Sequence, residues 1–277
     1  MKLPHRITVL ASLVQELQDN ISDNNIHKLL FIYCYKYACN NAYDFIWINN
    51  SPYCITIYED KKLLINKQIL QDSSNWLSYP DAFRFAKKLD MLEKLSLQKL
   101  KNDIAKNLVT DEIIDEAYGD YLKPIEVSDD QLIFYTIGYE GLNLEQYLNR
   151  LLTHKVSCLC DVRRNPYSQK FGFTKAELMK ALAMVNISYI HIPQLGVSSA
   201  LRQDLKNDSD YYNLLKQYET DVLPHQEQNI ELLKTLIIKH KHIAITCFEA
   251  KISHCHRSKI ASLMSAQSQQ QYMVKHI

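Results

Sequence analysis

The stretch Leu132-Ile133-Phe134-Tyr135-Thr136-Ile137, followed at once by Gly138-Tyr139-Glu140-Gly141, decides the fold of the second half of this chain. A short apolar run of this kind predicts a buried β-strand, and the two glycines predict a tight turn. Apolar residues at helical spacing over 144–151 then predict a helix. A strand, a glycine turn and a helix open a Rossmann-like unit, so we expect an α/β fold.

Further segments of the second half alternate between strand and helix patterns. Strands are predicted over 156–160, 187–192 and 243–248, and helices over 175–185, 227–240 and 253–264. Strands that alternate with helices are typical of a mainly parallel sheet that is covered on both faces. We therefore predict a Rossmann-like domain over residues 131–277, in which the polar stretch 265–271 is a frayed end.

The first half predicts a smaller α+β domain over residues 1–125. The spacing of its apolar residues predicts helices over 5–19 and from Ile26 to Tyr37, the second one capped by Asp23. The β-branched and aromatic stretch 53–58 and the run 63–65 predict the two strands of a hairpin.

Two more helices complete this first domain. Pro80 is expected to start a helix over 83–100, and Asp111 a short helix that Gly119 ends. The order helix, helix, hairpin, helix predicts a winged-helix-like fold. Residues 122–131, which contain Pro124, are expected to link the two domains.

The overall composition is that of a globular protein, with 47% hydrophobic and 23% charged residues. Its 32 basic and 31 acidic side chains nearly balance, which excludes a global basic field that would attract nucleic acid or an anionic membrane. No apolar run is long enough to span a membrane and no secretory signal is visible, so we expect a cytoplasmic protein. Its seven cysteines are expected to be reduced there.

The charge of the first half bears on its partners. Residues 1–130 carry 15 basic and 19 acidic side chains. A winged-helix-like module often binds DNA through a basic recognition helix, but the second helix offers only His27, Lys28 and Lys36. We therefore favour packing, or a homo-oligomer formed through this domain, and keep DNA contact as the alternative.

Polar residues follow each predicted strand of the second half at its carboxyl end. They are Gly138, Tyr139, Glu140 and Gly141 after the first strand, Asp161, Arg163 and Arg164 after the second, His191 at the end of the third with Gly196 after it, and Glu249, Cys255, His256 and Arg257 after the fourth. The carboxyl ends of parallel strands meet at one edge of a sheet, where such folds bind ligands. We expect these residues to form one ligand site.

Four ordered motifs within these clusters resemble the DUF488 family. They are Thr136-Ile137-Gly138-Tyr139-Glu140-Gly141, Asp161-Val162-Arg163 with Pro166 and Ser168, Leu195-Gly196, and Cys247-Phe248-Glu249 with Cys255-His256-Arg257. The resemblance covers residues 132–265, and the first half resembles the winged-helix-like extension that precedes some DUF488 domains. Val197 departs from the pattern, because it stands where the family commonly has a second glycine. The family is one of unknown function, so the resemblance implies a fold and a site but no reaction.

Glycines and arginines at this edge point to an anion. Gly138 and Gly141 form either a simple tight turn or the approach of a phosphate to the following helix N-terminus. Arg163 forms either an internal salt bridge with Asp161 or a fork onto a phosphate. Arg257, at the start of a predicted helix, is expected to anchor an anion.

Cys255 and His256 admit three interpretations. In the first, Cys255 packs while Arg257 anchors an anion from the helix start. In the second, Cys255 is a nucleophile with a lowered pKa. In the third, both residues bind zinc together with Cys247 and His254. We predict no metal, because Cys247 and Cys255 lie eight residues apart rather than two to four, and because Cys158 and Cys160 are expected to alternate sides of a strand. We predict no other cofactor either.

Glu249 is the main candidate for chemistry, since a carboxylate just beyond a buried strand is poorly solvated. Asp161 or Glu140 can supply a second carboxylate, and Tyr139 can stack on a ligand or donate a hydrogen bond. Two carboxylates, two arginines and a stacking tyrosine resemble the groups needed for cleavage or transfer at a glycosidic carbon, and a nucleotide fits the arginines.

Three hypotheses about function follow. The first is an enzyme acting on a nucleotide or nucleic-acid substrate, with Glu249 and Asp161 as acid and base and with Arg163 and Arg257 on phosphate. The second is a non-catalytic module that senses a nucleotide or a modified base. The third is an interaction protein with a vestigial site, whose arginines would be engaged internally.

Overall fold

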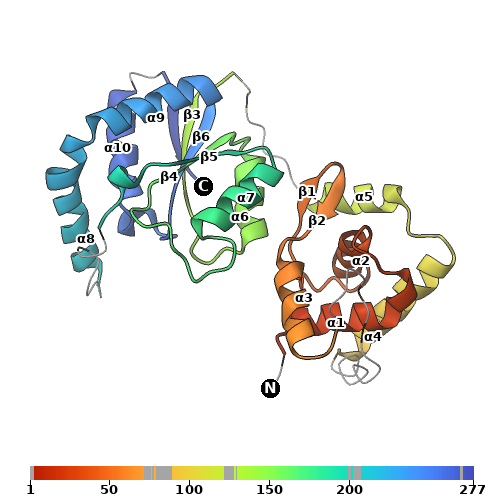
Figure 1. Ribbon diagram of the computed structural model, residues 1–277. Coiled ribbons are helices and arrows are strands. Elements are labelled where there is room, and N and C mark those ends of the chain that lie inside the picture. Colours follow the sequence, from red (N-terminus) through yellow and green to blue (C-terminus); the bar gives the residue numbers. More distant parts are fainter. Residues whose placement is uncertain are drawn as a thin grey trace. The chain divides into compact units, whose positions relative to one another are not determined.

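The computed structural model describes residues 3–71, 76, 78, 89–121, 128, 130–198, 201, 207–268 and 271–277. The chain divides into two compact units, Met1–Pro124 and Ile125–Ile277 (Figure 1). Among the described residues, no helix is both long enough and apolar enough to cross a membrane.

The C-terminal unit is built on a parallel sheet of five strands. In chain order they are β3 (Ile133–Gly138), β4 (Cys158–Asp161), β5 (Ser188–His191), β6 (His242–Cys247) and β7 (Met273–His276). In space their order is β5-β4-β6-β3-β7, and every pair of neighbours is parallel. The α/β fold and the four predicted strands are thereby confirmed.

Helices cover both faces of this sheet (Figure 1). They are α6 (Leu144–Thr153), α7 (Lys175–Met184), α8 (Asp208–Gln217), α9 (Glu227–His240) and α10 (Arg257–Gln267). Apolar residues of α8, α9 and α10 pack in one core with Ile243 and Ile245 of β6. Tyr147 of α6 lies on the opposite face, where its hydroxyl donates to Thr246 Oγ1 at 2.8 Å. Because both faces of β6 are covered, all six of its residues are buried, including the polar His242 and Thr246.

The last described segment differs from the prediction of a frayed end over 265–271. α10 continues to Gln267, and β7 follows at the edge of the sheet beside β3. Tyr272 is buried, and its hydroxyl donates to the Met264 carbonyl at 2.8 Å. One buried aromatic anchors a short strand that is otherwise largely exposed, so the segment carries no clear alternation of apolar and polar residues.

The N-terminal unit is mainly helical and contains one short hairpin. Its elements are α1 (His5–Leu17), α2 (Ile26–Ile32), β1 (Ile46–Ile48), β2 (Ser51–Tyr53), α3 (Thr56–Asn66), α4 (Met91–Ala105) and α5 (Asp111–Tyr121). α2 continues into a π-helical turn, Tyr33–Tyr37, so the first two predicted helices are confirmed. Pro80, residues 83–88 and most of the expected linker 122–131 lie outside the described residues. The winged-helix-like character of this unit stays a prediction.

The predicted hairpin over 53–65 is wrong, because residues 56–66 form α3. Ile57, Asp60 and Leu64 are buried on this helix at helical spacing. Asp60 conceals that spacing in the sequence, because its burial depends on a distant partner. Arg6 of α1 supplies it, with Nε 2.9 Å from Oδ2 and Nη2 3.0 Å from Oδ1 of Asp60.

The hairpin of this unit lies earlier and joins β1 to β2 through Asn49 and Asn50. Their φ angles are 50° and 57°, the left-handed values that two-residue hairpin turns favour. Two predicted helix ends are also wrong. Asp23 does not cap α2 but accepts a hydrogen bond from Trp76 Nε1 at 2.7 Å, and α5 runs past Gly119 to Tyr121.

Replacing Asn50 tests the position of the hairpin. Asn50→Gly is expected to keep or raise the free energy of unfolding, because glycine adopts positive φ without strain. Asn50→Val is expected to lower it by about 1–3 kcal/mol, because a β-branched side chain is strained there. Urea unfolding of the full chain measures both, and Asn102→Val at an exposed position of α4 with negative φ is the control. Equal unfolding midpoints for the two Asn50 variants would contradict this turn.

Candidate functional site

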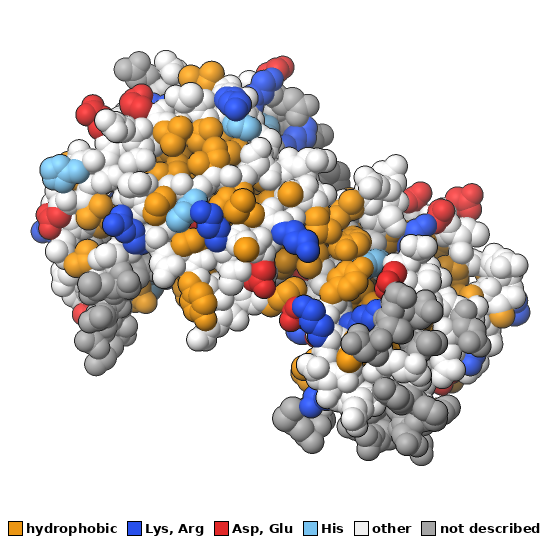
Figure 2. Space-filling model, viewed as in Figure 1, with side chains coloured by type: hydrophobic (Ala, Val, Ile, Leu, Met, Phe, Trp, Pro, Cys, Tyr) orange, Lys and Arg blue, Asp and Glu red, His pale blue; other side chains and the backbone are white. Residues whose placement is uncertain are grey.

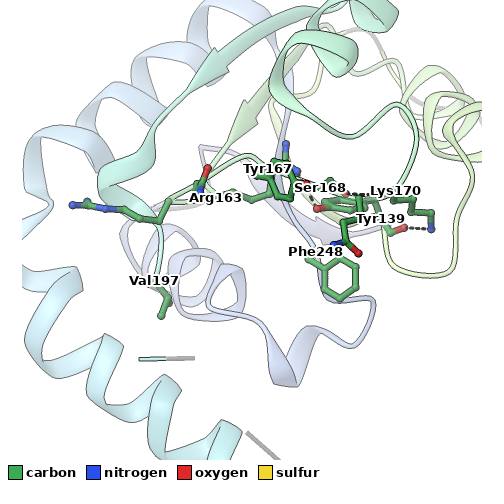
Figure 3. Close-up of a pocket in the computed structure, with 10 residues that line it drawn as sticks. Tyr139, Arg163, Tyr167, Ser168, Lys170, Val197 and Phe248 are labelled. Carbon is green, nitrogen blue, oxygen red and sulfur yellow. Dashed lines mark hydrogen bonds between the residues drawn. The ribbon is translucent and has the colours of Figure 1, made fainter. Parts of the chain in front are cut away.

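The loops at the carboxyl ends of β3, β4 and β6 line a pocket of about 580 Å³. Its lining residues are Tyr139, Arg163, Arg164, Asn165, Tyr167, Ser168, Gln169, Lys170, Val197 and Phe248. Figure 3 shows Tyr167, Ser168 and Lys170 grouped beside Tyr139 and Phe248. The edge of the sheet that was expected to hold a ligand therefore does contain a cavity.

A buried ion pair joins Asp161, the last residue of β4, to Arg163. Arg163 Nε donates to both carboxylate oxygens at 2.9 and 3.1 Å, and Nη2 donates to Oδ2 at 2.6 Å. The Arg163 backbone N–H and the Tyr189 hydroxyl add hydrogen bonds of 3.0 and 2.7 Å to the same carboxylate. Of the two arrangements that the sequence left open, the structure contains the internal salt bridge.

The third guanidinium nitrogen of Arg163 is engaged as well. Nη1 donates to the Tyr139 hydroxyl at 2.9 Å and to the Phe173 carbonyl at 2.8 Å. Burial by itself lowers the pKa of Arg163, but the hydrogen bonds and charge of Asp161 more than offset this effect and raise the pKa. Burial, and then the Asp161 charge, raise the pKa of Tyr189. Arg163 is thus charged and committed to Asp161, so these contacts do not favour its predicted role on phosphate.

Tyr139 is held in place by its neighbours. Its ring stacks on Phe173 with 4.3 Å between centroids, and Phe248 meets it edge-on at 5.3 Å. The Arg163 guanidinium lies 5.1 Å from the same ring. Because Tyr139 is only 3% exposed, it forms a rigid wall and offers little surface for the predicted stacking on a ligand.

Two aromatic side chains of the pocket are exposed, and neither was among the predicted site residues. Tyr167 and Phe248 are 70% and 41% exposed. Other hydrophobic side chains also reach the surface of this unit, with Lys and Arg side chains among them (Figure 2). The positions of these two residues within the family-like motifs could have identified them. Tyr167 lies between Pro166 and Ser168, and Phe248 lies between Cys247 and Glu249.

Two cations line the pocket beside these rings. Arg164 is exposed, and its Nη1 makes a long hydrogen bond of 3.4 Å to the Pro193 carbonyl. Lys170 is half-buried, and its Nζ donates to the Tyr139 carbonyl at 3.1 Å. Burial lowers the pKa of Lys170, although the charge of Glu140 opposes the shift. Arg164 is therefore the more accessible of the two to an anionic ligand.

The loop after β6 is fastened by two residues that were expected to touch a ligand. Buried Arg257 donates from Nη1 to the Glu249 carbonyl and from Nη2 to the Ala250 carbonyl, the latter at 2.9 Å. Glu140 accepts a hydrogen bond of 2.9 Å from the Ala250 backbone N–H. Neither Arg257 nor Glu140 lines the pocket. Their roles toward a ligand stay predictions that these internal contacts do not favour.

Close packing between loops accounts for two of the glycines. A Cβ on Gly138 would lie 2.0 Å from the Glu249 carbonyl oxygen, and one on Gly196 would lie 2.2 Å from the Arg164 backbone nitrogen. Gly141 has open space around it but a φ of +79°, which suits the turn before α6. Packing and backbone conformation thus explain the presence of glycine at these three positions without a bound phosphate.

Cys247, Cys255 and His256 come together at the end of β6, although their spacing argued against a shared site. Their ligand atoms lie within 4.8 Å of one another, and all three side chains are buried. Half-buried Glu249 accepts a hydrogen bond from Cys247 Sγ at 3.2 Å. The seven residues between the two cysteines form a loop that returns to the strand end, so distance along the chain does not argue against a metal.

Two other cysteine expectations also change. Burial raises the pKa of the Cys255 thiol, and the neighbouring Cys247 and Glu249 add to the shift. A nucleophilic cysteine is usually accessible and has a lowered pKa, so the structure does not favour that role for Cys255.

Cys158 and Cys160 do not lie on opposite faces of β4. Residues two apart on a strand share a face, and both cysteines belong to the same hydrophobic core.

Residues 143–264 match the family model described as domain of unknown function DUF488, which confirms the resemblance for the C-terminal unit. No curated protein and no solved structure matches the chain. The match concerns the kind of domain and specifies no reaction.

Removal of Arg163 tests whether the ion pair is structural. Arg163→Met is expected to lower the free energy of unfolding by about 3–5 kcal/mol, because Asp161 would remain buried without its partner. Asp161→Asn combined with Arg163→Met should recover part of this loss, because the unpaired charge is then gone. Denaturant unfolding measures these changes, and Arg150→Met at an exposed position of α6 is the control. A loss no larger for Arg163→Met than for Arg150→Met would refute the structural role.

Proposed function

We propose that this chain, whose C-terminal region is a DUF488 domain, binds a nucleotide, either free or within single-stranded nucleic acid, at the carboxyl edge of its sheet. The observation that carries the proposal is the combination of exposed Tyr167 and Phe248 with exposed Arg164 around one pocket. A nucleotide presents the matching groups, because its base offers a flat face and its phosphate accepts a guanidinium fork.

The remaining features of the pocket suit such a ligand. Its volume of about 580 Å³ falls within the range of roughly 300–1,000 Å³ that is typical of small-molecule sites. Asn165, Ser168 and Gln169 add amide and hydroxyl groups that can bond to a sugar or to base edges. Tyr139 and Arg163 keep one wall rigid, which reduces the ordering that binding requires.

Cleavage or transfer at the glycosidic bond of the bound nucleotide is the second candidate function. Glu249 favours it, because this half-buried carboxylate directly follows Phe248 of the pocket wall. Asp161 is poorly suited to be the second carboxylate, since it is fully buried and bound by Arg163 and Tyr189. These contacts support binding more strongly than a reaction that uses two carboxylates.

Other expectations stay predictions. The internal engagement of Arg163 and Arg257 is what an interaction protein with a vestigial site would have. DNA contact and homo-oligomer formation through the N-terminal unit, and a place in the cytoplasm, are likewise untested. A chain that binds no nucleotide in the experiment below would favour the interaction protein.

Calorimetric titration of the full chain with mononucleotides and with short single-stranded oligonucleotides tests the proposal. Phe248→Ala is expected to weaken affinity about 5- to 150-fold, because stacking on an aromatic side chain contributes about 1–3 kcal/mol per base. Arg164→Ala is expected to weaken binding and to reduce its dependence on salt, because one phosphate contact is lost.

Two variants outside the pocket serve as controls for this titration. Lys180→Ala removes an exposed cation from α7, and Tyr212→Ala removes an aromatic ring that is 65% exposed on α8. Both are expected to bind as the parent does. Equal weakening by a pocket variant and its control would show that binding is nonspecific and would contradict the proposed site. Binding of oligonucleotides but not of mononucleotides would assign the ligand to single-stranded nucleic acid.

Glu249→Gln tests the second candidate. If the chain cleaves a glycosidic bond, this variant is expected to keep nucleotide affinity and to release free base at least about 100-fold more slowly, because proton transfer by the carboxylate is lost. Chromatography of the products measures release, and Glu177→Gln at an exposed position of α7 is the control. Unchanged release by Glu249→Gln would end the catalytic assignment.

A further inference from the structure

We infer that Cys247, Cys255 and His256, together with Glu249, form a binding site for one zinc-type metal ion between the end of β6 and the start of α10. The inference starts from the convergence of three soft or borderline ligand atoms within 4.8 Å. It goes beyond the proposed nucleotide binding, since none of these four residues lines the pocket.

Distances within the cluster are close to those of a tetrahedral ligand shell. With metal–sulfur bonds of about 2.3 Å and metal–nitrogen bonds of about 2.0–2.1 Å, a sulfur and a nitrogen ligand lie about 3.5 Å apart. His256 Nδ1 lies 3.6 Å from Cys247 Sγ and 3.9 Å from Cys255 Sγ. Glu249 Oε2 lies 3.2 Å from Cys247 Sγ. Three ligand atoms are thus already close together, whereas Glu249 lies outside the group within 4.8 Å, so its carboxylate would have to move toward the other two to complete the shell.

His256 has the orientation of a metal ligand. Its Nε2 lies 3.2 Å from the Val162 carbonyl oxygen, which can only accept a hydrogen bond, so Nε2 carries the proton. In the neutral ring Nδ1 then has the lone pair, and this atom is the one that lies near both sulfurs. Histidines that bind metals typically use their other nitrogen in this way, which fixes ring and tautomer. This orientation favours a metal site over a simple cysteine pair.

The charges suit a divalent ion at this depth. Cys247, Cys255 and His256 are at most 1% exposed, and two thiolates cancel the charge of the ion, so the buried complex of these three ligands is neutral. Glu249 adds a negative charge at the half-buried side of the cluster, where the Arg257 guanidinium donates to its carbonyl oxygen. Thiolate and imidazole ligands select zinc over magnesium or calcium.

A bound ion would link three parts of the chain. Cys247 ends β6, Glu249 belongs to the loop that follows, and Cys255 and His256 directly precede α10. Phe248 lies between two of these ligands in sequence and in the wall of the pocket. The ion would therefore hold the loop that presents Phe248, and its role would be structural whatever the pocket binds.

Metal analysis of the full chain, purified under reducing conditions without chelators, tests the site. The parent is expected to carry about one zinc ion per chain, and Cys255→Ser and His256→Asn are expected to lose it. Cys158→Ser removes another buried thiol of the same sheet and should retain the ion. Cobalt(II) exchanged into the parent is expected to show tetrahedral d–d absorption and a thiolate charge-transfer band. This spectrum needs no variant, so the test remains decisive if a variant fails to fold.

Two results would contradict the metal site as a whole, and a third would remove one of its ligands. A parent that contains no zinc and takes up neither zinc nor cobalt overturns the site, and so does a Cys247–Cys255 disulfide in place of a metal. Glu249→Gln is expected to retain the ion with lower affinity in competition with a chelator, and unchanged affinity would remove Glu249 from the ligand set. Nucleotide titration is a separate measurement, so failure of the metal site and failure of the proposed function remain distinguishable.

Discussion

The ion pair between Asp161 and Arg163 is the constraint on which the carboxyl edge of the sheet depends. A single charge at this depth is costly, so the turn after β4 must keep the guanidinium on the carboxylate. From that position Arg163 also reaches Tyr139 and Phe173, and it thereby joins the loop after β3 to the loop after β4. The side chains left for a ligand are the exposed neighbours of this pair.

The loop after β6 is held by a different kind of contact. Gly138 lets the turn after β3 touch the Glu249 carbonyl, and Arg257 and Glu140 bind the backbone of the same loop. The proposed metal site would add a third fastening at the base of this loop. Rigid edges of this kind allow a few exposed groups to meet a ligand in a defined geometry.

Residue patterns predict the C-terminal fold well because every residue of β3 and β6 is buried and both strands are therefore mainly apolar. They fail for α3, where the paired carboxylate of Asp60 interrupts the apolar face, and for β7, a strand with no buried residue that directly follows the buried Tyr272. Residue types cannot distinguish an arginine that binds a ligand from one that binds a carboxylate, as Arg163 illustrates. Likewise, counting residues between Cys247 and Cys255 does not reveal that the intervening loop brings them together.

The strand order β5-β4-β6-β3-β7 has a consequence for the route by which the sheet assembles. β3 and β4 precede β6 in the chain, but they are not neighbours in the sheet, and each of them pairs with β6. Ile133 therefore cannot pair with its partner His242 until more than a hundred further residues have been synthesised. Parallel pairing over such separations is slow, and open strand edges attract other chains in the meantime. A defect in β6 would therefore be expected to promote aggregation during refolding.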